Sequence, residues 1–244
     1  MKDRFSGHSK QYAQFRPVYP PELYDFIFQQ VTGFDIAWDA GTGNGQAAKV
    51  LAQRFNKVYA TDISTQQLDQ AIQATNIQYS VAHEQTSFEE ASIDLVTVAQ
   101  AAHWFEMNKF CTEVKRVTKS HALIAIWGYG LLQISKPIDA IMTDFYTRTI
   151  GPYWDVERKH IDKHYANLHF PFSEIECPEF HLRVDWTLDE LEGYINTWSA
   201  VRQYISTHQH NPVDSLIKQI SQHWKETRQS VIFPLFLRLG RVHS

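Results

Sequence analysis

Short apolar runs alternate with amphipathic stretches over the first half of the chain. The apolar runs predict strands that are buried on both faces, at 35–39, 57–61, 77–81, 93–99 and 122–127. Between them, apolar residues recur every three to four positions and predict helices at 21–31, 45–55, 65–75 and after Asn108. Strands that alternate with helices in this way predict an α/β fold with a doubly wound, mostly parallel sheet.

The pattern changes after Gly130. A helical period covers 136–150, and an aromatic-rich stretch follows as far as Phe172. Further elements are predicted as strands at 180–185 and 230–240, giving a seven-stranded sheet, and as helices after Thr187 and over 212–226. We expect the parts to be a core of residues 1–130 and 176–244, an N-terminal lid at 1–20, and a helical insertion at 131–175 covering the substrate site.

The most specific chemistry lies between the first two strands. Asp39 ends the first strand, a turn with alternate glycines runs from Gly41 to Gly45, and Asp62 ends the second strand. Glycines let the backbone approach a ligand closely, and the following helix offers free N–H groups at its N-terminus. A carboxylate at the second strand end can accept hydrogen bonds from ribose hydroxyls. This βαβ unit predicts a site for an adenosine-containing ligand.

The glycine spacing bears on which ligand binds. Dinucleotide sites place glycines at the first, third and sixth positions of the turn, whereas Gln46 occupies the sixth position here. The spacing therefore disfavours a nicotinamide cofactor. An NAD(P)-dependent oxidoreductase built on the same βαβ unit stays open as an alternative, as does a non-catalytic cofactor-binding protein.

The Asp-x-Gly-x-Gly-x-Gly motif from Asp39 to Gly45, with Asp62 beyond it, resembles the first motif of class I S-adenosylmethionine-dependent methyltransferases. Other segments resemble the type 11 branch that includes trans-aconitate methyltransferase: Tyr12–Pro20, Ala99–Phe105, Thr197–Ser199 and Arg238–Arg241. The resemblance implies a Rossmann-like methyltransferase fold, S-adenosylmethionine as cofactor and S-adenosylhomocysteine as product. Lys119-Ser120-His121 departs from the Lys-Pro-Gly-Gly-like turn that is usual in the family.

The resemblance also implies which residues contact the cofactor. In the core these are Asp39, Gly41, Thr42, Gly43, Asp62, Ile63, His83, Glu84, Gln100 and Trp104. The N-terminal segment is expected to fold over the cofactor as a lid, with Tyr12 and Arg16 in contact with it. Arg16 has the planar fork that pairs with a carboxylate.

The acceptor side is expected near the end of the fourth strand, because ligands of such sheets bind outside the carboxyl ends of the strands. His103 follows that strand and is the candidate catalytic residue, either as a base that titrates near neutral pH or as a substrate anchor. Candidate substrate-binding residues are Tyr19, Trp154, Trp198 and Arg202.

The composition and charge of the chain limit the kinds of binding partner that we expect. The 244 residues carry a formal net charge of −4 without a basic cluster, which argues against a nucleic-acid partner. No apolar run is long enough to span a membrane, and the first residues lack the apolar core of a signal peptide, so we expect a cytoplasmic protein. Cys111 and Cys177 are isolated and the histidines are scattered, so no metal site is expected. The oligomeric state stays open, and a monomer is compatible with the sequence.

These features together predict a methyltransferase acting on a small molecule, through O-methylation of a carboxylic acid or a similar metabolite. A carboxylate is already ionised at neutral pH and needs only to be positioned. A phenol or an amine would need a base, for which His103 is the candidate. A protein or RNA methyltransferase is disfavoured by the charge and by the lack of an added recognition domain.

Overall fold

A central sheet organises the computed structural model, which describes residues 17–242. Within these residues the sheet has eight strands in the order β3-β2-β1-β4-β5-β8-β6, and β7 pairs with β8. The parallel strands are β1 (Ile36–Ala40), β2 (Lys57–Asp62), β3 (Ile77–Val81), β4 (Ile93–Ala99) and β5 (Thr118–Tyr129). The predicted doubly wound α/β fold is confirmed. The predicted strand number of seven is wrong, because a short strand, β6 (Ser173–Ile175), lies inside the expected insertion.

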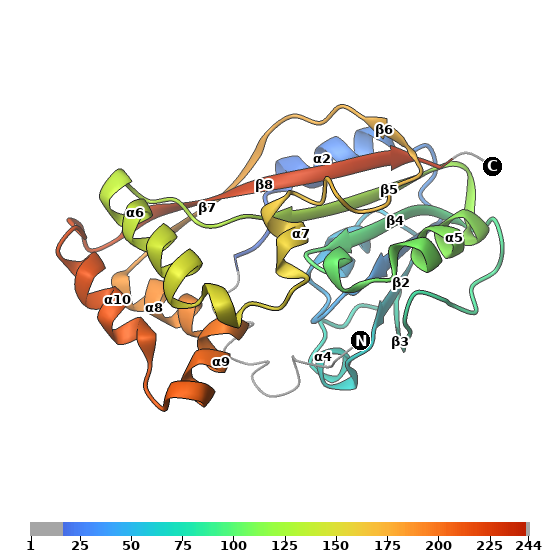
Figure 1. The fold of residues 1–244 in the computed structure, drawn as a ribbon. Coiled ribbons are helices and arrows are strands. Elements are labelled where there is room, and N and C mark those ends of the chain that lie inside the picture. The colour runs from blue at the N-terminus through green and yellow to red at the C-terminus, as the bar shows by residue number, and fades with distance from the viewer. Residues whose placement is uncertain (1–16, 243–244) are drawn as a thin grey trace.

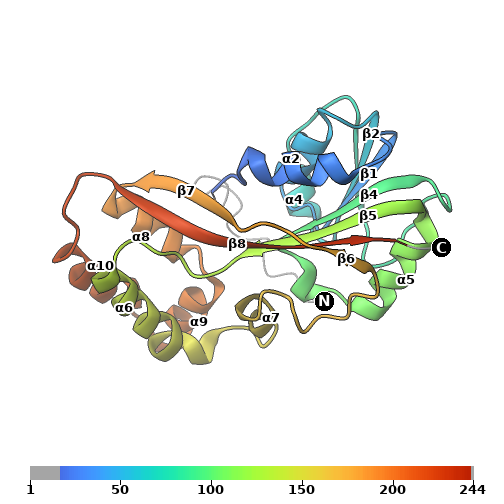
Figure 2. The ribbon, with the colours of Figure 1, turned by 90° about the horizontal axis from the view of Figure 1, so that it is seen from above.

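Helices cover both faces of the parallel strands, which explains why those strands are almost continuously apolar. The helices are α2 (Pro21–Gln30), α3 (Gln46–Leu51), α4 (Thr65–Asp69) and α5 (Met107–Val117). Ala37 packs with α2 and α3 on one face, whereas its neighbour Trp38 packs with Phe110 of α5 on the other. Figure 2 shows α2 and α5 on opposite sides of the sheet. Both α3 and α4 are shorter than the sequence pattern predicts.

The last strand, β8 (Gln229–Arg241), pairs antiparallel with three strands, and the short β6 lies along its C-terminal end. Residues 235–241 pair antiparallel with β5, whereas residues 229–235 pair with β7 (Phe180–Trp186). The strand therefore extends beyond the core, and β7 pairs with the part that extends, as Figure 1 shows.

A helical lobe packs on this extension of the sheet. It consists of α6 (Lys136–Asp144), the π-helical turn η2 (Phe145–Thr149), α8 (Leu188–Asn196), α9 (Ser199–His208) and α10 (Pro212–Ser221). Their apolar faces share one buried cluster with Leu182 of β7 and Phe233 of β8. The lobe thus combines residues 136–149 of the expected insertion with α8, α9 and α10, which were expected in the core. Figure 1 shows these helices together at one end of the molecule.

Three further short elements lie between these helices and strands in the chain. They are η1 (Ala102–Trp104), η3 (Gly151–Tyr153) and α7 (Arg158–Asp162). Among residues 17–242, none of the helices combines the length and the apolar character that a membrane crossing requires.

Candidate functional site

The glycine turn after β1 adopts a backbone that only glycine accommodates easily. Gly41, Gly43 and Gly45 have φ angles of +68°, +56° and +81°. A Cβ on Gly41 would lie 2.6 Å from Cβ of Ala101. A Cβ on Gly43 would meet no atom nearer than Oε1 of Gln67 at 4.0 Å, so it would occupy space in the cleft that Gly43 lines. The turn is therefore closed on its protein side and open toward a ligand.

Asp39 supports this turn from inside the protein. Its side chain is fully buried, and its two carboxylate oxygens accept hydrogen bonds from the hydroxyls of Thr42, at 2.5 Å, and Thr97, at 2.7 Å. Burial raises the pKa of Asp39 to about 6, against its usual 3.8, although these hydrogen bonds act in the opposite direction. Asp39 does not line the cleft. Two roles are open for Asp39 from the sequence, positioning the loop and facing the cofactor, and the structure shows the contact with the loop.

Asp62 lies on the open side of the same turn. Its Oδ2 accepts from the backbone N–H of Gly43 at 2.8 Å, and its Oδ1 accepts from that of Ser64 at 2.9 Å. The carboxylate lines the cleft, so the acid that holds the glycine turn also faces the space beside it. This arrangement fits ribose hydroxyls, because a carboxylate retains acceptor capacity after two hydrogen bonds.

A cleft at the carboxyl ends of β1, β2 and β4, called the main cleft here, collects most of the expected cofactor residues. Its empty volume is about 1020 Å³. The expected residues that line it are Gly41, Thr42, Gly43, Asp62, Ile63, His83, Gln100, Trp104 and Tyr19. Tyr19 was expected on the substrate side and lies here instead. Tyr12 and Arg16 lie outside the described residues.

Glu84 does not line the main cleft, contrary to expectation. Its carboxylate is buried and accepts from the backbone N–H of Glu106 at 3.0 Å, just before α5. It therefore fastens the loop that carries Ala82 and His83, both of which do line the cleft. The position of Glu84 in the sequence could not show whether its side chain contacts a ligand or holds the loop.

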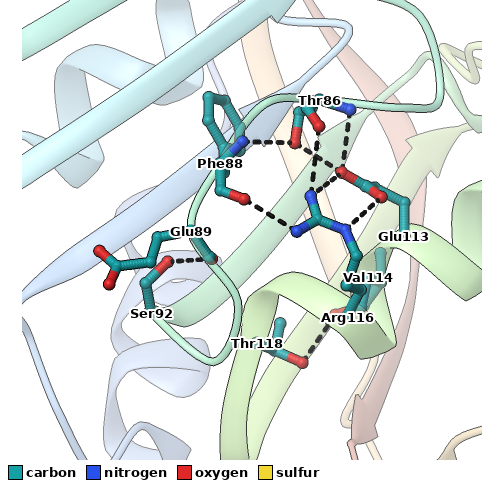
Figure 3. Close-up of polar contacts among 8 residues, drawn as sticks. All are labelled: Thr86, Phe88, Glu89, Ser92, Glu113, Val114, Arg116 and Thr118. Atoms are coloured by element: carbon teal, nitrogen blue, oxygen red, sulfur yellow. Dashed lines mark hydrogen bonds and ion pairs between the residues drawn. The ribbon is translucent and has the colours of Figure 1, made fainter.

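A second anchor holds the far side of the same loop, and Figure 3 shows its hydrogen bonds. Oε1 of Glu113 accepts from the backbone N–H of Thr86 at 2.9 Å and from its hydroxyl at 2.6 Å. Arg116 pairs with the same carboxylate and donates to the backbone carbonyls of Thr86 and Phe88. Burial disfavours the charge of Glu113, but the hydrogen bonds from Arg116 and Thr86 outweigh it and lower its pKa. The loop after β3 is thus fixed to α5 at both ends.

A second hollow, the side pocket, adjoins the main cleft and shares Gln100, Trp104 and Tyr129 with it. Its empty volume is about 730 Å³. Besides Gln100 and Trp104, four expected residues line it: His103, Trp154, Trp198 and Arg202. Residues of the core and of the helical lobe therefore meet around one space.

His103 comes from η1, directly after β4. Its side chain is buried, and Nδ1 lies 2.9 Å from Oη of Tyr165, a fully buried residue that follows α7. Its ring also lies 4.7 Å from that of Trp104, measured between centroids. The imidazole is thus held beside Tyr165 and Trp104, and it lines the side pocket but not the main cleft.

Several lining residues were not singled out from the sequence. In the main cleft they include Pro17, Asn44, Gln46, Gln67, Phe105 and Tyr129. In the side pocket they are Asp155, Arg158, Ile161, Tyr194, Thr197 and Ser199. Tyr129 follows from the rule that loops after parallel strands line the site. The side-pocket residues depend on how the lobe packs, for which the sequence holds no comparable rule. Among residues 17–242, no three His, Cys, Asp or Glu side chains are grouped to hold a metal ion.

The sheet order, the glycine turn and the acid that faces it define a doubly wound α/β protein that binds an adenosine-containing cofactor. Comparisons with known proteins refine this class. The sequence profile of a family described as "Methyltransferase domain" matches residues 38–126. A Dictyostelium discoideum protein assigned as a methyltransferase is 33% identical over 249 residues, which cover 98% of this chain and 95% of the relative.

Solved structures of methyltransferases are also similar to this chain. A protein from Anaeromyxobacter dehalogenans, assigned as a type II methyltransferase, is 33% identical with a TM-score of 0.87, covering 94% of this chain and 99% of the other. The phosphoethanolamine N-methyltransferase 2 of Haemonchus contortus, solved with S-adenosylhomocysteine, shares the fold at 16% identity and a TM-score of 0.52, covering 98% of this chain and 58% of the other. The chain belongs to the class I S-adenosylmethionine-dependent methyltransferases, and its cofactor is S-adenosylmethionine. The alternatives of an oxidoreductase and of a non-catalytic protein are therefore set aside.

Asp39→Asn should remove a pH dependence of stability. Because the folded protein raises the pKa of this carboxyl to about 6, the folded state retains a proton that the unfolded state loses above pH 3.8. The stabilisation is present at low pH and is lost as the pH rises through 6. Relative to the variant, the wild type should lose up to about 3 kcal/mol of unfolding free energy between pH 4 and 7. Urea denaturation of both proteins at several pH values measures this, and a constant difference would contradict it.

Asp62→Asn should weaken cofactor binding without unfolding the protein. The amide retains one acceptor oxygen for the turn but loses the charge that faces the main cleft. We expect the Kd for S-adenosylhomocysteine to rise roughly 10- to 100-fold in calorimetric titration. Asp69→Asn, on the exposed side of α4, is the matched control and should bind as the wild type does.

Glu113→Gln should loosen the loop after β3 from α5. The amide retains one acceptor for Thr86 but no longer neutralises Arg116. The expected result is weaker S-adenosylhomocysteine binding, by about 3- to 10-fold, with faster hydrogen exchange confined to residues 82–92. Glu106→Gln breaks an exposed ion pair with Lys109 on the same helix and serves as the control. Equal effects of both variants would mean that the buried anchor has no special role.

Proposed function

We propose that this methyltransferase transfers the methyl group to a small molecule, and that the acceptor atom is a carboxylate oxygen. The observation that carries the proposal is the side pocket, which adjoins the main cleft and is lined by Arg158, Arg202 and His103. The pocket is lined by aromatic side chains together with a few charged groups, which is typical of small-molecule sites. The resemblance to the branch that includes trans-aconitate methyltransferase supports the same acceptor chemistry.

The charges in the side pocket favour an anionic acceptor. Among the lining residues, two arginines, Arg158 and Arg202, outnumber one acidic residue, Asp155. Guanidinium groups pair with carboxylates through two parallel hydrogen bonds. A carboxylate acceptor is already ionised at neutral pH, so no proton has to be removed from it. His103 is then needed only to position the acceptor, and no general base is required.

The residues around the junction have three tasks in this reaction. When bound, the cofactor supplies a methyl group on a sulfonium, which is an activated electrophile. Gly43 and Asp62 are the residues suited to hold it, through a close backbone approach and through its ribose. His103 and the arginines orient the acceptor, and Trp104 lines both hollows and limits the access of water. Orientation of the two reactants can supply much of the rate acceleration.

The test is methyl transfer from labelled cofactor to a panel of aromatic and aliphatic carboxylic acids. The panel includes the amide, the alcohol and the amine of each carbon skeleton. We expect base-labile methyl esters from acids and no product from the matched amides and alcohols. Labelled phenols or amines in place of esters would overturn the proposal.

The pH profile separates an anchor from a base at His103. For a carboxylate acceptor, kcat/KM should stay nearly constant from pH 6 to 8 in the wild type. It should stay equally flat in His103→Gln, with a higher KM. A wild-type profile that rises with pH, together with a loss of that rise in the variant, would make His103 a general base.

A further inference from the structure

The guanidinium of Arg158 is held in a cage of aromatic side chains. Its Cζ lies 4.7 Å from the ring centroid of Trp154 and 5.5 Å from that of Tyr146. Nε donates to Oη of Tyr146 at 2.7 Å, and it lies 3.9 Å from Oδ1 of Asp162. The side chain is only 21% exposed. Stacking and a hydrogen bond therefore fix the plane of this guanidinium before any ligand binds.

The phenol that holds Arg158 is itself oriented. Oη of Tyr146 donates to Oδ1 of Asp162 at 2.7 Å, and its oxygen accepts from Nε of Arg158. Burial raises the pKa of Tyr146 to about 12, so the hydroxyl keeps its proton at neutral pH. The negative charge of the group thus stays on Asp162, and the chain Asp162-Tyr146-Arg158 is fully hydrogen-bonded up to Nε.

The other end of the guanidinium is available. Within residues 17–242, Nη1 and Nη2 of Arg158 make no hydrogen bond to the protein, whereas Nε is occupied. These two nitrogens carry four N–H groups in one plane, which is the fork that a carboxylate matches with its two oxygens. Arg158 lines the side pocket, so a bound molecule can reach the fork.

An aromatic wall continues from the cage. The ring of Trp154 lies 5.6 Å from that of Trp198, which in turn meets the ring of Tyr194 edge-on at 5.8 Å. All three residues line the side pocket together with Arg158. The wall offers flat apolar surface beside a cationic fork, and a planar apolar body with a carboxylate at one end fits both features.

We propose that the side pocket binds a planar, aromatic or conjugated monocarboxylic acid, whose carboxylate pairs with the Nη1 and Nη2 fork of Arg158. Asp162 already compensates part of the charge of Arg158, so the fork matches a monoanion better than a phosphate dianion. The inference rests on the proposed function only in taking this ligand as the methyl acceptor. Arg158 is then a residue that determines acceptor specificity.

The experiment measures ligand binding rather than turnover. The full-length protein, saturated with S-adenosylhomocysteine, is titrated calorimetrically with benzoate, with its neutral isostere benzamide, with cyclohexanecarboxylate and with phenyl phosphate. Benzoate should bind most tightly. Arg158→Gln should weaken benzoate roughly 10- to 100-fold, the range for losing a charge-assisted hydrogen-bond pair. Arg158→Lys retains the charge without the fork, so its affinity for benzoate should lie between that of the wild type and that of Arg158→Gln.

The control is Arg148→Gln, which removes an arginine that is 83% exposed and paired with Asp144 on the same lobe. It should bind benzoate as the wild type does. Unchanged S-adenosylhomocysteine affinity and thermal unfolding show that each variant is folded. If Arg158→Gln fails to fold, Arg158→Lys decides, because unaltered benzoate affinity in that variant overturns the proposal.

Four other results also overturn it. They are no benzoate binding by the wild type, equal binding of benzamide, equal binding of cyclohexanecarboxylate, or tighter Arg158-dependent binding of phenyl phosphate. Failure of the proposed function is a separate result. In that case benzoate still binds through Arg158, but no carboxylic acid of the panel yields a methyl ester.

Discussion

The pairing of one strand, β8, with β5 in the core and with β7 under the helical lobe is the constraint on which the position of the side pocket depends. Residues 235–241 are hydrogen-bonded to β5 in the core, and residues 229–235 to β7 under the helical lobe. A register shift of one residue would exchange the buried and exposed faces of the strand, so both pairings are strongly specified. The lobe is therefore fixed relative to the carboxyl ends of β4 and β5, and the side pocket forms where it meets them.

Two carboxylates near the glycine turn have distinct roles because their surroundings differ. Asp39 is fully buried, and the hydroxyls of Thr42 and Thr97 satisfy it. Asp62 also bonds to the turn, but it lines the main cleft. A buried charge costs free energy unless hydrogen bonds compensate it. The protein retains Asp39 at this cost because it ties the turn to β4, and this leaves Asp62 in a fixed place beside the cofactor.

The sequence predicted the core better than the lobe, for physical reasons. Strands buried on both faces leave continuous apolar runs, and the turn between Asp39 and Asp62 has a specific spacing, so the sheet and most of the main cleft were predictable. Helix α9 was missed because its N-cap is Trp198, which makes no side-chain capping bond, and because it ends at Gln209 rather than at a glycine. Arg158 was missed because α7 has five residues, too few for a helical period. Its importance arises from rings that come together only in the folded lobe.

An unusual residue, Gln100, bridges the ends of β4 and β5 at the junction of the two hollows. Its φ angle of +55° is unfavourable for a side chain with a Cβ. Two contacts offset this cost: the backbone N–H of Gln100 donates to Trp127 at 2.8 Å, and Oε1 accepts from the N–H of Tyr129 at 3.0 Å. A Cβ on Gly128 would lie 2.5 Å from that Oε1, so the glycine in β5 makes room for the bridge. Methyl transfer requires donor and acceptor to meet in one line. Strain at this point is therefore compatible with the proposed function, because the bridge joins the ends of β4 and β5 between the two hollows.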